Sequence, residues 1–218
     1  MITLTDIEKL IPTLQETWNP IGPDGRVRYR KRDSSENRDI WQSVFLQRET
    51  AKGMVNLLND LPDDFSKMTV LDAGCDAGLF SVVLSQLFKN VIGIDYDEIS
   101  VERANQTLEV FKNAGFDVSN VKIEHKDFRK SYMKNPSNIN ALFNHDSGTG
   151  PGKPPHDKNK TILDKVDFIL ITDRGRDAEY MKASKEELEK YNFKVELHKS
   201  QNVPVEDVII GRKYETNI

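Results

Sequence analysis

The stretch Val70-Leu-Asp-Ala-Gly-Cys-Asp-Ala-Gly-Leu-Phe80 decides the fold, because it changes from a strand pattern to a helix pattern within a few residues. The apolar run at 68–72 is typical of a buried strand, and apolar residues recur at helical spacing through 79–88. Gly74 and Gly78 lie between the two elements. Glycine has no side chain, so the chain can turn tightly at these positions and a ligand can approach the backbone.

Strands and helices continue to alternate after this stretch. Residues 98–114 have the pattern of an amphipathic helix, and Ser184 with Glu187 matches a capping box that predicts the start of a short helix. The further predicted strands are 91–95, 121–124, 166–172, 193–197 and 208–210. This rhythm predicts right-handed crossovers and parallel pairing. The sequence therefore predicts an α/β fold of the Rossmann-like, doubly wound kind: a mostly parallel sheet with helices on both faces and a closing antiparallel strand pair.

The chain is expected to divide into two parts. Residues 1–67 contain helical patterns and are predicted to form an N-terminal helical extension, which covers the sheet or serves as a lid. Residues 68–218 are predicted to form the ligand-binding domain. Within that domain, the stretch around 131–165 has almost no apolar residues after Phe143, and it is interpreted as a mobile inserted loop.

Acidic residues follow successive strands of the predicted sheet, whose carboxyl ends meet at one edge. Asp95 ends the second strand, and its carboxylate can accept hydrogen bonds from both hydroxyls of a ribose. Asp127 follows the third strand and can reach an adenine amino group, with Phe128 against the base. Asp72 can lie near the amino acid end of the same ligand. These positions suit a ligand with an ammonium group, a ribose diol and an adenine.

This combination resembles the class I S-adenosylmethionine (SAM)-dependent methyltransferase superfamily. VLDAGCDAGLF at 70–80 and VIGIDYDE at 91–98 resemble its first motif and its following acidic motif, and KIEHKDF at 122–128 resembles its adenine-side motif. The resemblance implies SAM as the cofactor, with the glycine turn against its methionine part and the strand-two acid on its ribose. The predicted cofactor-binding residues are Asp72, Gly74, Cys75, Gly78, Asp95, Tyr96, Asp127 and Phe128.

One position departs from the G-x-G-x-G pattern of this superfamily, since Asp76 stands in place of the middle glycine. The departure leaves an unusual mode of SAM binding or a lost activity as alternatives. A nicotinamide-dependent Rossmann enzyme fits the sequence less well, because its G-x-G-x-x-G pattern from Gly74 fails at Asp76 and at Leu79. A carboxylate at position 76 would also face a pyrophosphate, whereas SAM carries a sulfonium and no phosphate.

Candidate catalytic residues are expected after the later strands, where the resemblance places the methyl acceptor. A general base is needed only if the acceptor must lose a proton. Asp173 is the first candidate and His145 the second, and each also fits a capping or surface role. The superfamily has seven strands, and only six are recognisable here. If 141–143 is the missing strand, Asn144, His145 and Asp146 lie on the acceptor side, and Asp173 is no longer the first candidate for the general base.

A basic strip, RVRYRKR at 26–32, contains five cations in seven residues. As a solvated strand or loop the strip needs no function. In the alternative interpretation, its arginines bind the phosphates of a substrate, RNA included. The predicted substrate-binding residues are Arg26, Arg28, Arg30 and Arg174.

The composition limits location and partners. A single cysteine excludes an intrachain disulfide, and with the histidines widely spaced no metal site is predicted. The formal charge of −4 argues against a protein that coats nucleic acid. The N-terminus lacks the pattern of a signal peptide and no apolar run is long enough to cross a bilayer, so we expect a cytoplasmic protein without a membrane partner.

These patterns together predict a SAM-dependent methyltransferase. The predicted acceptor is a small metabolite, such as a sugar or a phosphorylated compound. One alternative is an RNA methyltransferase that uses the basic strip. The other is a protein that binds SAM without catalysis.

Overall fold

The computed structural model describes residues 4–17, 57–128, 130–132, 138–145, 160–173, 178–199 and 207–214. Its strands are β1 (Thr69–Ala73), β2 (Asn90–Asp95), β3 (Val121–His125), β4 (Ala141–His145), β5 (Phe168–Asp173), β6 (Phe193–Lys199) and β7 (Asp207–Lys213). Its helices are α1 (Leu4–Thr17), α3 (Leu79–Leu84), α4 (Glu98–Asn113), α5 (Lys160–Leu163) and α6 (Ala178–Lys190), with a 3-10 helix η1 (Phe65–Lys67) before β1.

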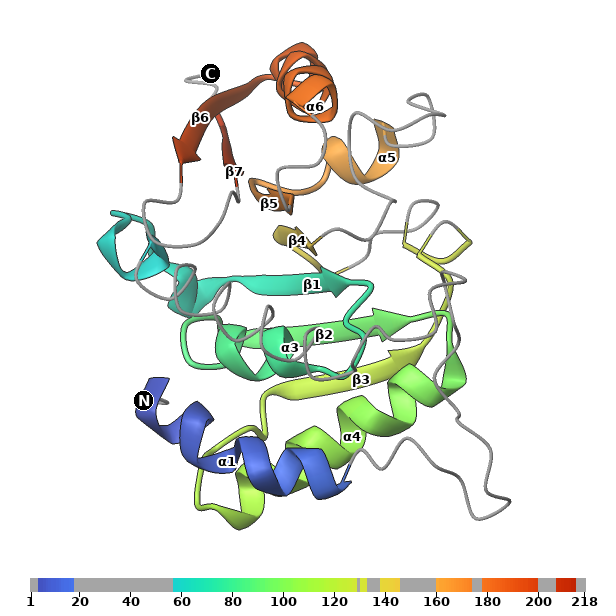
Figure 1. Cartoon of the computed structure of the whole chain (residues 1–218). Coiled ribbons are helices and arrows are strands. Elements are labelled where there is room, and N and C mark those ends of the chain that lie inside the picture. The colour runs from blue at the N-terminus through green and yellow to red at the C-terminus, as the bar shows by residue number, and fades with distance from the viewer. Residues whose placement is uncertain are drawn as a thin grey trace.

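The strands form one sheet in the order β3-β2-β1-β4-β5-β7-β6. Neighbours from β3 to β5 are parallel, whereas β7 runs antiparallel to both β5 and β6. The predicted sheet and its closing antiparallel pair are therefore confirmed. The arrowheads of β1, β2 and β3 point to the same edge (Figure 1). The chain order reverses between β1 and β4, and ligands of open α/β sheets bind beside such a reversal.

Apolar side chains alternate between the two faces of the sheet. On β4, Phe143 packs in the core cluster that contains residues of α1, α3 and α4, whereas Leu142 packs in the cluster that contains residues of α5 and α6. On β5, Leu170 packs in the first of these clusters and Ile171 in the second. Because these strands are covered on both faces, they are continuous apolar runs in the sequence. The predicted helices on both faces are confirmed (Figure 1).

The interpretation of 131–165 as one inserted loop is wrong in its middle. Residues 141–145 form β4, which pairs with β1 on one side and β5 on the other. Its apolar part, 141–143, is fully buried but too short to give a clear strand pattern. The two neighbouring strands supply the hydrogen bonds that fix this segment as a strand. Residues 160–163 form α5, while 133–137 and 146–159 lie outside the described residues.

The start of helix α6 also differs from the prediction. The helix begins at Ala178, so Ser184 lies in its interior and does not cap it. Ser184 is buried on the same helix face as Met181 and Leu188, which pack in the core cluster on that side of the sheet. Burial of this continuous face outweighs the local capping signal, and it extends the helix toward the N-terminus.

The N-terminal extension contributes to the core through α1. This helix packs against α4 (Figure 1), and Ile7 and Leu14 are buried in the cluster on that face. Residues 18–56 of the extension lie outside the described residues, whereas 57–58 are helical and Leu58 is buried. The described part of the extension therefore packs against α4 and joins the core on that face, and its role as a cover or lid stays a prediction.

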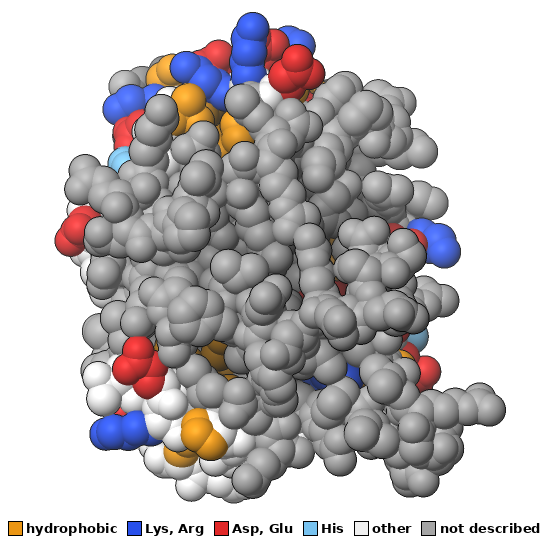
Figure 2. Space-filling model, in the orientation of Figure 1, with side chains coloured by type: hydrophobic (Ala, Val, Ile, Leu, Met, Phe, Trp, Pro, Cys, Tyr) orange, Lys and Arg blue, Asp and Glu red, His pale blue; other side chains and the backbone are white. Residues whose placement is uncertain are grey.

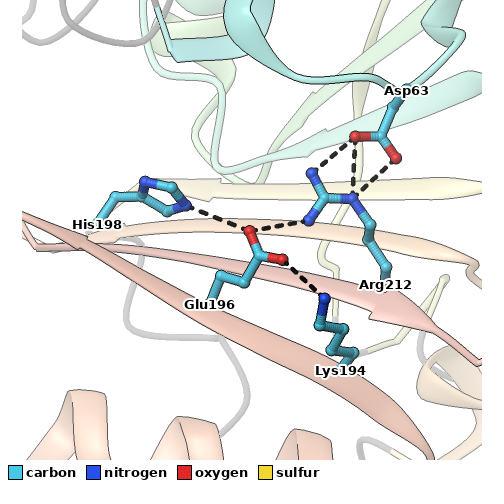
Figure 3. A network of polar contacts seen from close by, with 5 residues as sticks. All are labelled: Asp63, Lys194, Glu196, His198 and Arg212. Atoms are coloured by element: carbon cyan, nitrogen blue, oxygen red, sulfur yellow. Dashed lines mark hydrogen bonds and ion pairs between the residues drawn. The ribbon is translucent and has the colours of Figure 1, made fainter.

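A charged cluster joins the segment that leads into β1 to the antiparallel end of the sheet (Figure 3). Arg212 Nε on β7 donates to both carboxylate oxygens of Asp63 at 2.9 Å, and its Nη2 donates to Oδ2 at 2.7 Å. Arg212 Nη1 also lies 3.3 Å from Glu196 Oε2 on β6. Glu196 in turn contacts Lys194 and His198 from its own strand. Such partly buried, bidentate pairs are stronger than single surface ion pairs.

Replacing Arg212 by alanine is expected to lower the free energy of unfolding by about 2 kcal/mol, because the charge-assisted bonds to Asp63 are lost. Urea unfolding at pH 7 measures this effect. Lys194→Ala is the control, since Lys194 is largely exposed. It is expected to cost less than about 0.5 kcal/mol. Equal losses in the two variants would contradict a special role for the Arg212–Asp63 pair.

The outer surface of α6 carries charges of both signs (Figure 2). Lys182 Nζ lies 4.0 Å from Glu186 Oε1, and Lys185 Nζ lies 3.8 Å from Glu189 Oε1; the two residues of each pair are one helical turn apart. Exposed pairs of this kind stabilise a helix only slightly. Within the part of the chain that the structure describes, no helix combines the length and the apolar character needed to cross a membrane.

Candidate cofactor site

The loop between β1 and α3 turns back on itself through left-handed backbone conformations. Gly74, Asp76 and Gly78 have φ angles of 79°, 46° and 77°. The backbone N–H groups of Gly74 and Cys75 both donate to the Ile94 carbonyl at 2.9 Å, which holds the loop against the end of β2. Gly74 and Asp76 are partly exposed, whereas Cys75, Ala77 and Gly78 are buried. The loop therefore presents part of its backbone at the edge of the sheet where the parallel strands end.

The local conformation explains the departure at Asp76. A φ of 46° lies in the left-handed region, which most side chains avoid and which glycine enters freely. Aspartate and asparagine are the other residues that adopt this conformation readily, because their short polar side chains can hydrogen-bond locally. Asp76 thus keeps the turn that the glycine pattern requires and adds a carboxylate to it.

Helix α4 packs directly against the loop at Gly78. A Cβ atom at Gly78 would lie 2.9 Å from Ala104 Cβ and 3.0 Å from Ala104 Cα. The Thr107 hydroxyl donates to the Ala77 carbonyl at 2.7 Å, one helical turn further along α4. Gly78 is therefore required both for its backbone conformation and for the close approach of the helix.

Asp95, the last residue of β2, lies against this loop. Its Oδ2 accepts the backbone N–H of Asp76 at 3.1 Å, and its Oδ1 accepts the backbone N–H of Asp97 at 2.9 Å. The side chain is 9% exposed. Burial raises the pKa of the Asp95 carboxyl, while these two hydrogen bonds act to lower it. The carboxylate is thus held in one orientation between the glycine-rich loop and the start of α4.

Asp72 lies on β1, just before the loop, and is 1% exposed. Burial, together with the negative charges of Asp95 and Asp76, raises the pKa of its carboxyl to about 7, against a hydrogen bond from Ser81 that lowers it. The Ser81 hydroxyl donates to Asp72 Oδ2 at 2.5 Å. Sequence reasoning missed Ser81, although a serine in an otherwise apolar helix is a signal for a buried polar partner.

Three further predicted cofactor-binding residues follow β2 and β3: Tyr96, and the adenine-side residues Asp127 and Phe128. Tyr96 is 56% exposed, and its carbonyl oxygen lies 2.9 Å from His125 Nε2. The Asp127 side chain is partly exposed, and its Oδ2 atom lies 3.6 Å from Lys130 Nζ. Phe128 is only 6% exposed and packs in the core cluster with residues of α5 and α6. Its ring therefore supports the edge of the sheet, with little surface left for a base.

Cys75 is buried within the loop. Burial raises the pKa of its thiol, and the carboxylates of Asp72, Asp95 and Asp76 raise it further. The thiol therefore stays protonated at neutral pH and packs as a small apolar group. Only the backbone of Cys75 is in a position to contribute to a binding surface.

On the acceptor side, β4 places its carboxyl end next to that of β1. Asn144 pairs with Ala73 of β1 in the register and is 2% exposed. His145 and Asp173 end β4 and β5, but their side chains lie outside what the structure describes. Because 141–143 belongs to a strand, the alternative prediction applies, in which Asn144, His145 and Asp146 rather than Asp173 are expected on the acceptor side. The remaining candidates, Arg26, Arg28, Arg30, Asp146 and Arg174, lie outside the described residues.

The strand order, the glycine-rich loop after β1 and the acid after β2 together define the class I SAM-dependent methyltransferase superfamily. A family model described as "Methyltransferase domain" matches residues 64–202. The chain belongs to this family and is a methyltransferase by family. No curated protein matches the chain by sequence.

Solved methyltransferase structures share this fold at low sequence identity. Magnesium protoporphyrin IX methyltransferase from Synechocystis, solved with bound SAM, matches with a TM-score of 0.58 and 15% identity, over 98% of this chain and 99% of that chain. Precorrin-6y C5,15-methyltransferase from Geobacter metallireducens matches with a TM-score of 0.58 and 14% identity, over 77% and 89%. An rRNA methylase from Streptococcus thermophilus matches with a TM-score of 0.50 and 16% identity, over 78% and 97%.

Proposed function

We propose that the chain binds SAM on the loop after β1 and transfers its methyl group to a small-molecule acceptor. The observation that carries the proposal is the Asp95 carboxylate, which two backbone N–H groups hold beside a loop of left-handed residues. A carboxylate fixed in this way can still accept hydrogen bonds from a ribose diol through its remaining lone pairs. Gly74 and Asp76 are both partly exposed, which fits the approach of the methionine part of SAM to this loop.

The other predicted contacts extend the site along the edge of the sheet. We assign the adenine side to Tyr96 and Asp127, which follow β2 and β3 and retain exposed surface. The buried Asp72 acts on the methionine end through its charge. Gly78 acts indirectly, by letting α4 pack against the loop.

When SAM is bound, it supplies a methyl group that is already activated by the sulfonium. The chain then has to align the acceptor with the methyl carbon and exclude competing water. The end of β4 adjoins the end of β1, so we assign acceptor contacts to Asn144 and, if the acceptor must lose a proton, the role of base to His145.

The proposed acceptor is a small metabolite, such as a sugar or a phosphorylated compound. The formal charge of −4 supports this choice, because proteins that bind RNA without a dedicated domain usually present a net positive face. Labelled methyl transfer from SAM into fractionated metabolites and RNA tests the choice. Label in RNA, lost when Arg26, Arg28 and Arg30 are replaced by alanine, would favour the RNA alternative. Binding of SAM without label in any fraction would favour a non-catalytic protein.

Replacing Asp95 by alanine is expected to raise the dissociation constant of SAM by about 100-fold, because two charge-assisted hydrogen bonds to the ribose are lost. Isothermal titration calorimetry measures the change. Asp117→Ala is the control, since Asp117 precedes β3 and therefore lies at the opposite edge of the sheet. Thermal unfolding must show that the Asp95 variant still folds. A folded variant with unchanged SAM affinity would contradict the proposed site.

A further inference from the structure

The carboxylate at Asp76 is the feature of the loop that the superfamily pattern does not include. We propose that Asp76 makes the site discriminate between cationic SAM and its neutral product, S-adenosylhomocysteine, and so assists product release. The inference rests on the proposed function, because it concerns the selectivity of the same site.

The loop concentrates negative charge in a small and partly buried region. Asp72 and Asp95 lie on adjacent strands, and the Asp76 backbone N–H donates directly to Asp95 Oδ2 at 3.1 Å. The carboxylates of Asp76 and Asp95 both raise the pKa of Asp72, after burial, which shows that the charges interact across the loop. A positive charge bound here would experience the combined potential of the group.

SAM and its product differ by one methyl group and one unit of charge. SAM has a sulfonium, an ammonium and a carboxylate, so its net charge is +1, whereas the thioether product is neutral overall. Hydrogen bonds to the ribose, the adenine and the amino acid part are the same for the two molecules. Within such a loop, the charge on sulfur is therefore the main basis for preferring one over the other.

Asp76 can change this preference without rebuilding the site. Its backbone contact to Asp95 uses the N–H group, which any residue except proline retains. Its left-handed conformation is also accessible to asparagine. The Asp76 Oδ1 atom lies 3.4 Å from the Ser100 hydroxyl on α4, and an asparagine oxygen can accept there as well. Asp76→Asn therefore removes the charge and is compatible with these three features of the loop.

Calorimetry at low salt with three ligands tests the proposal: SAM, S-adenosylhomocysteine and sinefungin, an analogue with an amine in place of the methylsulfonium. In the wild-type protein, SAM and sinefungin are expected to bind more tightly than the neutral product. In Asp76→Asn, the preference for SAM over the product should fall by about three- to tenfold. The affinity for sinefungin should change in the same way as the affinity for SAM. In 0.5 M salt, the difference in ligand preference between the wild type and Asp76→Asn should be smaller.

Asp117→Asn is the matched control, because it removes one charge from an exposed position at the opposite edge of the sheet. It should leave the preference unchanged. If Asp76→Asn keeps the wild-type preference for SAM over the product, or loses affinity equally for all three ligands, the role of Asp76 is overturned and the proposed function is left intact. Failure of the wild-type protein to bind any of the three ligands would instead refute the proposed function.

Discussion

Replacing Gly78 by alanine is expected to lower the free energy of unfolding by about 2–5 kcal/mol. A residue with a Cβ costs about 1–2 kcal/mol in the left-handed conformation, which Gly78 adopts with a φ of 77°. The new Cβ would also lie 2.9 Å from Ala104 Cβ and 3.0 Å from Ala104 Cα, so helix α4 must move away from the loop. Overpacking of this kind costs about 1–3 kcal/mol more. Urea unfolding followed by circular dichroism measures the total.

Gly115→Ala separates the two costs. Gly115 also has a left-handed backbone, with a φ of 89°, but a Cβ there would meet no described atom within 4 Å. Its substitution is expected to cost about 1–2 kcal/mol, from the backbone alone. The difference between the variants gives the cost of displacing α4. If Gly78→Ala costs no more than Gly115→Ala, then α4 does not pack against the loop as closely as the structure indicates.

Replacing Asp72 by asparagine is expected to stabilise the protein against unfolding, increasingly so as the pH rises from 5 to 8. The pKa of the Asp72 carboxyl is about 7 in the folded protein, against its ordinary value of 3.8. Between these values the unfolded chain releases a proton that the folded chain keeps, so rising pH favours unfolding of the wild type. Asparagine does not titrate. Its advantage should therefore grow by about 3 kcal/mol between pH 5 and pH 8 and level off above the folded pKa.

Denaturant unfolding at several pH values measures this difference. Ser81→Ala provides an independent check, because the Ser81 hydroxyl donates to Asp72 and lowers its pKa. Without that hydrogen bond, the pH-dependent loss of stability should extend to higher pH. A constant difference between wild type and Asp72→Asn across this range would show that Asp72 does not titrate as described. A gain in stability with weaker SAM binding would identify Asp72 as a site where function is kept at the expense of stability.

Local patterns were sufficient for the first half of the domain. The apolar runs that became β1, β2 and β3 are each followed by a glycine turn or an acidic residue, and these signals lie within a few positions of the structure that they specify. Helix α4 likewise follows from its own periodicity and from Asp97, whose side chain accepts the backbone N–H of Ser100 at the helix start. The parallel sheet and the superfamily could therefore be predicted from the chain alone.

Segments with weak local signals were decided by their neighbours. Strand β4 has only Ala141–Phe143 as an apolar run, and it is a strand because β1 and β5 supply hydrogen bonds on both sides. Helix α6 begins before the predicted cap at Ser184 because its buried face continues to Met181. Local propensity is a weak determinant wherever tertiary burial opposes it or extends beyond it.

For the candidate site, too, the sequence determined some properties and the tertiary structure determined others. The sequence by itself determined which residues follow the strands, and hence that Asp72, Asp95 and Asp127 lie along one edge of the sheet. Only the tertiary structure decided their chemistry: the burial that raises the pKa of Asp72, the backbone N–H groups that orient Asp95, and the packing that removes Phe128 from the surface. Burial and hydrogen-bond partners depend on residues far away in the chain, so the amino-acid pattern around a residue does not specify them.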